Sequence, residues 1–241
     1  MNEVVKNWLK EIEAGKLNSD NIERSLRYAH DLEQGLARMQ TYAQGVGIFG
    51  SARTPENSKY YKAAYQLGKE LAENGHPVVT GGGPGMMEAA SRGCYESGGR
   101  SIGLNIILTH EQLPNPYLTD VLEFRYFFAR KVMLTFSSKV FVFFPGGFGT
   151  MDEFTEILLL MQEDKMPDMP MFLYGKSFWS PLDKFFKNKM EKGIKAIGPR
   201  DRNIYKITGD IHEIVRAANK IGHPSVHDNL YQNFSKDHSA I

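Results

Sequence analysis

Apolar positions in the first forty residues recur at helical spacing. One group lies between Val4 and Ile12, and a second follows Ser19 and Asp20, which are both suitable N-cap residues, and runs to Met39. This pattern predicts two amphipathic helices. They either pack on the outside of the main domain alone or also contribute to a subunit interface.

From Gly45 onward, short apolar runs alternate with helical patterns. Strands are predicted over residues 46–50, 77–80, 101–105, 121–124, 139–144, 169–174 and 204–208. Helices are predicted over residues 58–75, 86–96, 127–136, 178–192 and 210–221, with another directly after Thr150. Nearly continuous apolar strands that alternate with helices are typical of a doubly wound α/β fold. We therefore expect a mostly parallel sheet of about seven strands with helices on both faces.

The chain divides into three parts on this interpretation. A helical extension covers residues 1–44, one α/β domain covers residues 45–222, and a polar tail that we expect to be loosely ordered covers residues 223–241. The segment 106–117 contains two prolines and is predicted to be an excursion between strands.

Composition narrows the choice of partners. The 241 residues include 29 basic and 28 acidic side chains, so no overall field favours nucleic acid or a membrane surface, and any anion must be recognised locally. The single Cys94 excludes an internal disulfide and a multi-cysteine zinc site; it is either a packing residue or a reactive thiol. With no signal peptide and no apolar stretch of roughly 20 residues, we expect a soluble, cytoplasmic protein.

Three glycine-bearing turns follow predicted strands, at residues 50–52, 81–85 and 145–150. Helix N-termini present free N–H groups to an anion, and glycine lets the backbone approach it closely. Thr150 is expected to add a hydroxyl and to cap the following helix, and Ser51 to donate a second hydroxyl. Because the carboxyl ends of parallel strands meet at one edge, the three turns predict a single crevice.

These turns do not match the usual phosphate motifs. Neither glycine run continues into the Lys-Ser/Thr pair of a Walker loop, and the first strand lacks the spacing of a dinucleotide fingerprint. A glycine-rich turn alone is explained equally well by a tight turn beside a closely packed helix.

Charged residues near the turn at residues 145–150 bear on whether this turn binds a ligand. Asp152, Glu153 and Glu156 are predicted in the first two turns of their helix, where they either complement the helix dipole or serve part of a ligand. Arg130 lies on an apolar helix and needs a partner, which Glu153 can supply across the crevice.

Four motifs carry a resemblance to a known family. Residues 145–153, PGGFGTMDE, match the P-G-G-x-G-T-x-x-E signature of the LOG (Lonely Guy) family, and residues 130–133, RKVM, resemble its second motif. Residues 81–90 and 50–53 resemble its glycine loop and the end of its first strand. The resemblance spans about residues 45–221 and points to a longer-chain branch of the family.

The resemblance implies a Rossmann-like nucleotide-binding fold, a homodimer or larger homo-oligomer, and hydrolysis of a nucleoside 5′-monophosphate to free base and ribose 5-phosphate. The substrate would be AMP or an N6-substituted AMP, the latter being a cytokinin ribotide. By correspondence with the motifs, Arg130 and Glu153 are the catalytic pair. The expected substrate and phosphate contacts are Ser51, Gly82, Gly83, Glu88, Lys131, Gly146, Gly147, Gly149 and Thr150.

Only one glycosidic bond breaks in this reaction, so we expect neither a metal nor an organic cofactor, and no nucleic-acid or membrane partner. The competing hypotheses are a nucleotide-binding or sensing protein without turnover, and a nucleosidase of broader range that accepts GMP or CMP. Base selectivity is assigned to the segment 106–117 and to pocket residues that the sequence does not locate. A nicotinamide oxidoreductase is disfavoured, because the sequence lacks the dinucleotide-binding fingerprint of that class.

Overall fold

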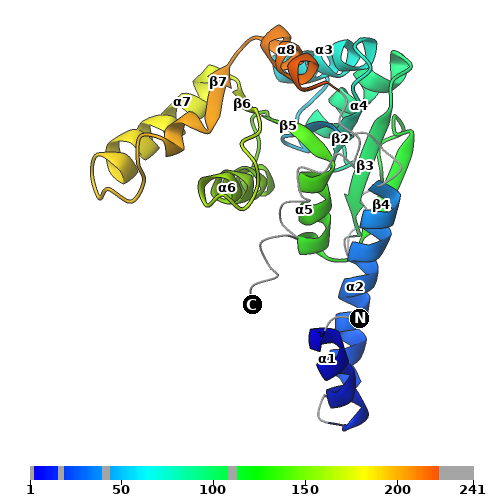
Figure 1. Ribbon diagram of the computed structural model, residues 1–241. Helices are drawn as coiled ribbons and strands as arrows, with labels where there is room; N and C mark the ends of the chain where they lie inside the picture. The colour runs from blue at the N-terminus through cyan, green and yellow to red at the C-terminus, as the bar shows by residue number, and fades with distance from the viewer. Residues whose placement is uncertain (1–2, 16–18, 40–43, 108–112, 223–241) are drawn as a thin grey trace.

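A single parallel sheet forms the centre of the protein (Figure 1). The computed structural model describes residues 3–15, 19–39, 44–107 and 113–222. The seven strands lie in the order β4-β3-β2-β1-β5-β6-β7, and every neighbouring pair is parallel. Their bounds are β1 Gly45–Phe49, β2 Val78–Thr80, β3 Ser101–Ile106, β4 Asp120–Phe124, β5 Ser138–Phe143, β6 Met171–Tyr174 and β7 Tyr205–Thr208. The predicted fold class is confirmed.

Helices cover both faces of the sheet. One apolar layer holds side chains of α5 (Phe127–Phe136), α6 (Phe148–Gln162) and α7 (Lys176–Phe185). The opposite layer holds side chains of α3 (Lys59–Glu73), α4 (Met86–Glu96) and α8 (Ile211–Ile221). The strands are buried on both sides, which explains their continuous apolar sequence.

Helices α3 and α4 approach each other unusually closely because a glycine of each lies at the contact. A Cβ on Gly68 would lie 2.1 Å from the carbonyl oxygen of Ala90, and one on Gly93 would lie 1.9 Å from that of Tyr65. No side chain fits at either position. The pair therefore sets the distance between the two helices that flank the end of β2.

The two N-terminal helices are present as α1 (Glu3–Glu13) and α2 (Ser19–Met39), and they extend beyond the sheet as an arm (Figure 1). The buried carboxylate of Asp31 on α2 accepts hydrogen bonds from the backbone N–H groups of Arg125 and Tyr126, at 2.8 and 3.3 Å. This contact ties the arm to the start of α5. The division into three parts stays a prediction, and the polar tail, 223–241, lies outside the described residues.

Three local expectations need correction. The strand predicted from residue 169 begins only at Met171, because Pro170 has no N–H to give to a ladder. The helix predicted over 178–192 is α7, which contains Pro181, followed by a π-helical segment at Phe186–Glu191. Thr150 does not cap α6, as described below.

Two further observations bear on the sequence analysis. Cys94 is fully buried, and burial raises the pKa of its thiol to about 11, which is the behaviour of a packing residue. Among the helices that the structure describes, none is long and apolar enough to cross a membrane.

The close packing of α3 and α4 predicts that Gly93→Ala destabilises the protein strongly. The added methyl group would overlap the carbonyl oxygen of Tyr65, so we expect the free energy of unfolding to fall by about 2 kcal/mol or more in urea titrations. Gly209→Ala is the matched control, because a Cβ there meets nothing within 4 Å. Equal stability of the two variants would contradict the packing argument.

Candidate active site

One cavity of about 460 Å³ lies at the carboxyl ends of β1, β2, β3 and β5. This is where parallel α/β sheets place their ligands. Of the residues predicted from the sequence, Ser51, Arg130, Gly147, Gly149, Thr150 and Glu153 line it. Gly82, Gly83, Glu88, Lys131 and Gly146 do not. The structure thus brings the proposed catalytic pair and most of the signature loop together.

The signature loop opens directly into the N-terminus of α6. The helix begins at Phe148, and Gly147 is its N-cap, without any side-chain capping bond. Thr150 therefore lies within the first turn rather than at the cap; it is 5% exposed and lines the cavity. The N–H groups of the first turn have no intrahelical acceptor, so they remain available to an anion.

Helix α6 starts earlier than the sequence pattern indicated, and this changes the reading of its acidic residues. No acidic side chain lies in the first turn of the helix. Asp152, Glu153 and Glu156 follow it, so the helix dipole explains them poorly. Each of the three instead forms an ion pair with a basic residue of α5.

The central ion pair of the cavity joins α5 to α6. The Arg130 guanidinium donates to the Glu153 carboxylate at 3.0 Å, and each side chain is 13% exposed. Arg130 also lies over the Phe127 ring, 5.4 Å from its centroid. Its Nε–H is buried without an acceptor among the described residues. A ligand oxygen in the cavity would satisfy this donor.

The pKa of Glu153 is shifted far from its ordinary value. Burial raises it to about 7, against the opposing effect of the Arg130 charge. A carboxyl that titrates near neutral pH can take up or release a proton during a reaction. Glu153 is therefore equipped for acid–base chemistry as well as for electrostatic stabilisation.

Lys131 follows Arg130 on α5 but has a different environment. Its ammonium forms ion pairs with Asp152 and Glu156, both at 3.2 Å. Burial acts to lower the pKa of Lys131, and the two carboxylates outweigh it, so the net direction is upward. In this arrangement Lys131 links α5 to the outer side of α6, and its predicted phosphate contact stays a prediction.

The glycine loop at residues 81–85 contributes one residue to the cavity lining, and neighbouring hydrogen bonds hold the loop in place. Gly81 lines the cavity, whereas the carbonyl oxygens of Gly82 and Gly83 each accept a hydrogen bond of 3.0 Å from the side-chain amide of Asn115. Glu88 accepts a hydrogen bond from the Tyr61 hydroxyl at 3.2 Å. These residues hold the loop in shape.

Ser51 and its neighbours connect the three turns. The Ser51 N–H donates to Pro145 O at 3.1 Å, and Ser51 O accepts from the N–H of Met86 at 3.0 Å. Gly85 sits beside this junction with a φ of +69°, and a Cβ there would lie 2.5 Å from Ser51 O. The expected single crevice is built by these contacts.

Several residues that line the cavity were not among the predicted site residues, including Arg53, Met87, Asn105 and Phe127. Arg53 belongs to the motif at residues 50–53, and its guanidinium has no partner among the described residues. Asn105 is a polar residue at the end of an otherwise apolar strand, and that position was a usable signal. Met87 and Phe127 look like ordinary packing residues in a sequence.

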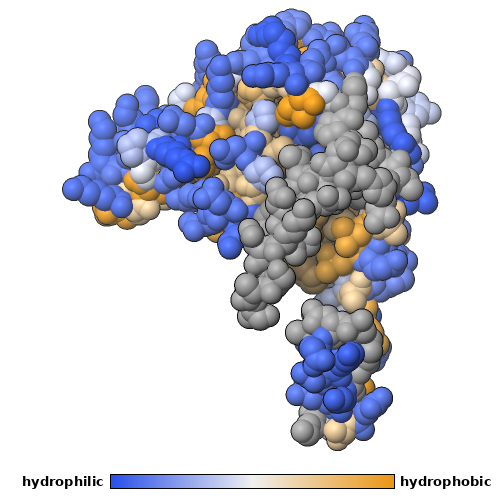
Figure 2. Space-filling view, in the orientation of Figure 1, coloured by the Kyte–Doolittle hydropathy of each residue, from blue (hydrophilic) through white to orange (hydrophobic). Residues whose placement is uncertain are grey.

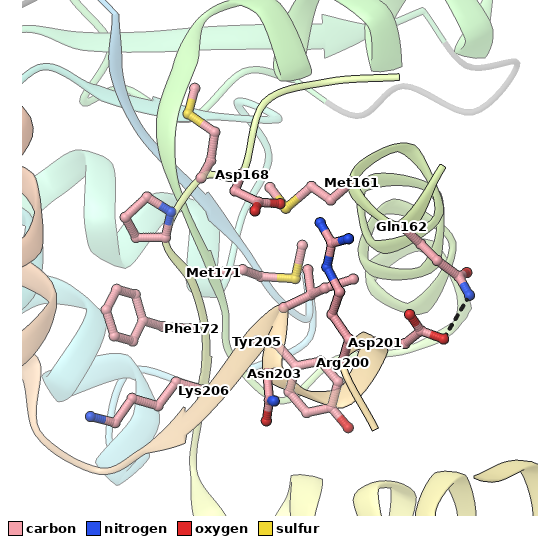
Figure 3. A pocket seen from close by; sticks show the side chains of 13 residues that line it. Met161, Gln162, Asp168, Met171, Phe172, Arg200, Asp201, Asn203, Tyr205 and Lys206 are labelled. Carbon is pink, nitrogen blue, oxygen red and sulfur yellow. Dashed lines mark hydrogen bonds between the residues drawn. The ribbon is translucent and has the colours of Figure 1, made fainter. Parts of the chain in front are cut away.

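A second pocket of about 460 Å³ lies elsewhere, where α6 ends and β6 and β7 begin (Figure 3). Met161, Met171 and Tyr205 form its buried floor, and Arg200 and Asp168 lie at its exposed rim. None of the residues predicted from the sequence lines it. Within the described residues, no cluster of three His, Cys, Asp or Glu side chains is placed to hold a metal ion.

Comparison with known families agrees with this geometry. The profile of a family described as "Possible lysine decarboxylase" matches residues 87–218, which include α5, the signature loop and α6. Curated relatives of the chain carry LOG names. The chain belongs to the LOG family.

Two plant relatives give the scale of the similarity. The chain is 33% identical over 120 residues to the rice protein named "Probable cytokinin riboside 5'-monophosphate phosphoribohydrolase LOGL5", a match that covers 48% of each protein. It is 26% identical over 186 residues to the Arabidopsis thaliana enzyme named LOG3, covering 76% of this chain and 85% of the relative.

Solved structures of related fold include molybdenum cofactor proteins. The molybdenum cofactor carrier protein of Chlamydomonas reinhardtii is 25% identical, with a TM-score of 0.55 over 74% of this chain and 97% of that one. The molybdenum cofactor binding protein of Rippkaea orientalis, 24% identical with a TM-score of 0.55 over 73% and 94% of the two chains, shares the fold.

The raised pKa of Glu153 predicts how stability depends on pH. The folded state binds this proton more tightly than the unfolded state, so the stabilisation is complete below about 4.5 and is lost as pH rises through about 7. We expect wild-type stability relative to Glu153→Gln to fall between pH 4.5 and 8, by roughly 3 kcal/mol at most.

Urea unfolding of both proteins across this pH range measures the effect. Glu123→Gln, which removes an exposed carboxylate, is the control. A stability difference that rises with pH would mean that Arg130 dominates and holds the carboxylate charged.

Proposed function

We propose that this LOG-family protein is a nucleoside 5′-monophosphate phosphoribohydrolase that releases the free base and ribose 5-phosphate from AMP or an N6-substituted AMP. One observation carries the proposal: the buried Arg130–Glu153 pair lies in the same cavity as the N-terminus of α6. The arrangement combines a phosphate site with a carboxylate that titrates near neutral pH. The names of the plant relatives support the same activity.

The phosphate binds at the first turn of α6. The N–H groups of Gly149 and Thr150 and the Thr150 hydroxyl are available there, and Arg53 supplies a cation from the loop after β1. Nothing lies within 4 Å of a Cβ placed on Gly147 or Gly149, so an anion has room beside the loop.

The ribose then lies over Glu153. Cleavage of an N-glycosidic bond passes through a cation-like ribosyl group, which a carboxylate stabilises electrostatically. Glu153 takes a proton from the attacking water as oxygen bonds to C1′, and the C1′–N bond breaks with its electrons on the base. The proton held by Glu153 then passes to the departing base, which restores the carboxylate. Arg130 keeps its charge throughout, so it orients Glu153 and, through its free Nε–H, a substrate oxygen.

A carrier that binds a nucleotide-like cofactor without turnover is the alternative, since proteins of related fold are named as molybdenum cofactor carriers. A carrier has no need of a buried carboxylate beside the ribose, where it adds cost to anion binding. Incubation with AMP, GMP, CMP and N6-isopentenyl-AMP, followed by chromatography of the free bases, separates the two. Bound but intact nucleotide in every case would favour the carrier.

The proposal predicts that Glu153→Gln abolishes most turnover while nucleotide binding persists. The lost interaction is made mainly in the transition state, so kcat should fall on the order of a hundredfold or more with little change in KM. Arg130→Ala should lose activity and also bind AMP more weakly, because its guanidinium serves the ground state too.

Melting temperatures of the same samples provide the control. If the pair is only a structural ion pair, both variants lose thermal stability and retain catalysis per folded molecule. Full activity of a folded Glu153→Gln protein would end the proposal.

We also propose a homodimer or a larger homo-oligomer in which α5 contributes to the contact. Figure 2 shows hydrophobic residues gathered between α2 and α5. Both helices carry exposed apolar side chains: Leu36 on α2 is 43% exposed, and Phe128 on α5 is 42% exposed. Light scattering at micromolar concentration should give at least twice the mass of the chain, and Phe128→Glu should lower it. A stable wild-type monomer would contradict this.

A further inference from the structure

Asn105 is a buried side chain of the cavity with no assigned role. It lies at the carboxyl end of β3, is 3% exposed and lines the cavity together with Arg130 and Thr150. Its side-chain amide forms no hydrogen bond with any residue in the described part of the chain. Its amide is not among the fully buried polar atoms that lack a partner, so its N–H donors and its oxygen are open to the cavity, where a ligand can pair with them.

Asn115 shows what a purely structural asparagine looks like in this protein. It is 6% exposed, and its amide donates to Gly82 O and Gly83 O while its oxygen accepts from the N–H of Tyr117. Every polar group of that side chain has a partner. Asn105 is buried to the same degree at the same edge of the sheet, but its hydrogen-bonding groups are left for something in the cavity.

The strand order fixes where Asn105 lies relative to the phosphate loop. The loop follows β5, and β1 and β2 separate β5 from β3. Three strand spacings amount to about 14 Å. An extended nucleoside monophosphate covers most of this distance, and the Asn105 side chain with its hydrogen bonds covers the rest. With phosphate at α6 and ribose over Glu153, the base reaches the end of β3.

The surroundings of Asn105 suit a heterocyclic base. Met87, Ile106 and Phe127 are among the apolar residues that line the cavity, and Ile106 directly follows Asn105 on β3. Apolar walls with a single amide are typical of sites that hold a flat ring and read one of its edges. The cavity lining therefore offers both the N-terminus of α6 for an anion and apolar side chains for a ring.

We propose, on the basis of the function proposed above, that Asn105 selects 6-aminopurine nucleotides by pairing with the adenine N6–H donor and N7 acceptor. An asparagine amide matches this donor–acceptor pair in both directions. Guanine presents two acceptors, O6 and N7, at the same edge, so one hydrogen bond is lost and two oxygens are opposed. An adenine with one N6 substituent keeps an N6–H and remains a ligand.

The test compares AMP with GMP in the wild type and in Asn105→Leu and Asn105→Asp. Leucine keeps the size and removes the hydrogen bonds, and aspartate keeps the shape but loses the donor to N7. We expect kcat/KM for AMP to fall roughly 10- to 100-fold in both variants. In Asn105→Leu the value for GMP should change little, so that the preference for AMP disappears. In Asn105→Asp a carboxylate faces O6 and N7 of guanine, so the value for GMP should fall as well and AMP should stay preferred. Asn203→Leu and Asn203→Asp, at an exposed position outside the cavity, are the matched controls.

Equal losses for AMP and GMP in Asn105→Leu would overturn the proposal, because they would place Asn105 at the ribose or in the fold. Unchanged values would overturn it as well.

Calorimetric affinities for AMP and GMP in the same variants distinguish failure of the base-selection proposal from failure of the hydrolase proposal. If no nucleotide is hydrolysed but AMP binds better than GMP through Asn105, the hydrolase proposal fails and base selection stands. If the wild type binds AMP no better than GMP, base selection fails. Melting temperatures identify a misfolded leucine variant. In that case the aspartate variant decides, and a value for AMP that does not fall there would overturn the proposal.

Discussion

The Arg130–Glu153 ion pair is the interaction on which the candidate site depends. Its two side chains come from different helices, α5 and α6, and meet where the strands end. Burying a carboxylate beside a guanidinium costs desolvation, which the raised pKa of Glu153 reflects. A fold that needed only stability would be served as well by two apolar residues. The retained charge, together with an unsatisfied Arg130 Nε–H, is more easily explained by a ligand that completes the network.

The strand order places different functional groups side by side along the carboxyl edge of the sheet. The loop after β5 presents N–H groups to an anion, the turns after β1 and β2 close the space beside it, and the end of β3 carries an unpaired amide. Two close backbone contacts hold this arrangement: Gly85 beside Ser51, and the crossing of α3 with α4 at Gly68 and Gly93. The cavity is therefore a consequence of the connections between strands.

Much of this follows from the sequence, and the exceptions have physical causes. Buried parallel strands are continuous apolar runs, so all seven were located to within two residues at their starts and one at their ends. The start of α6 was placed too late because Phe148 and Gly149 look like loop residues, although Gly147 can serve as an N-cap without a side chain. The glycine run gave no reason to distinguish Gly81, which lines the cavity, from Gly82 and Gly83, which do not. The difference depends on Asn115, whose amide donates hydrogen bonds to the carbonyl oxygens of Gly82 and Gly83. Asn105 was missed because an apolar pattern locates the strand but gives no weight to a single polar residue near its carboxyl end.

The most direct test of the central claim is affinity for a cationic mimic of the transition state. An iminoribitol 5-phosphate carries a positive charge where the ribosyl cation forms, so a site built around the Glu153 carboxylate should bind it far more tightly than ribose 5-phosphate. Calorimetry on the wild type and on Glu153→Gln measures this preference with no turnover involved. The account predicts a strong preference for the cation in the wild type that disappears in the variant. Equal affinity of the wild type for the charged mimic and for ribose 5-phosphate would contradict it.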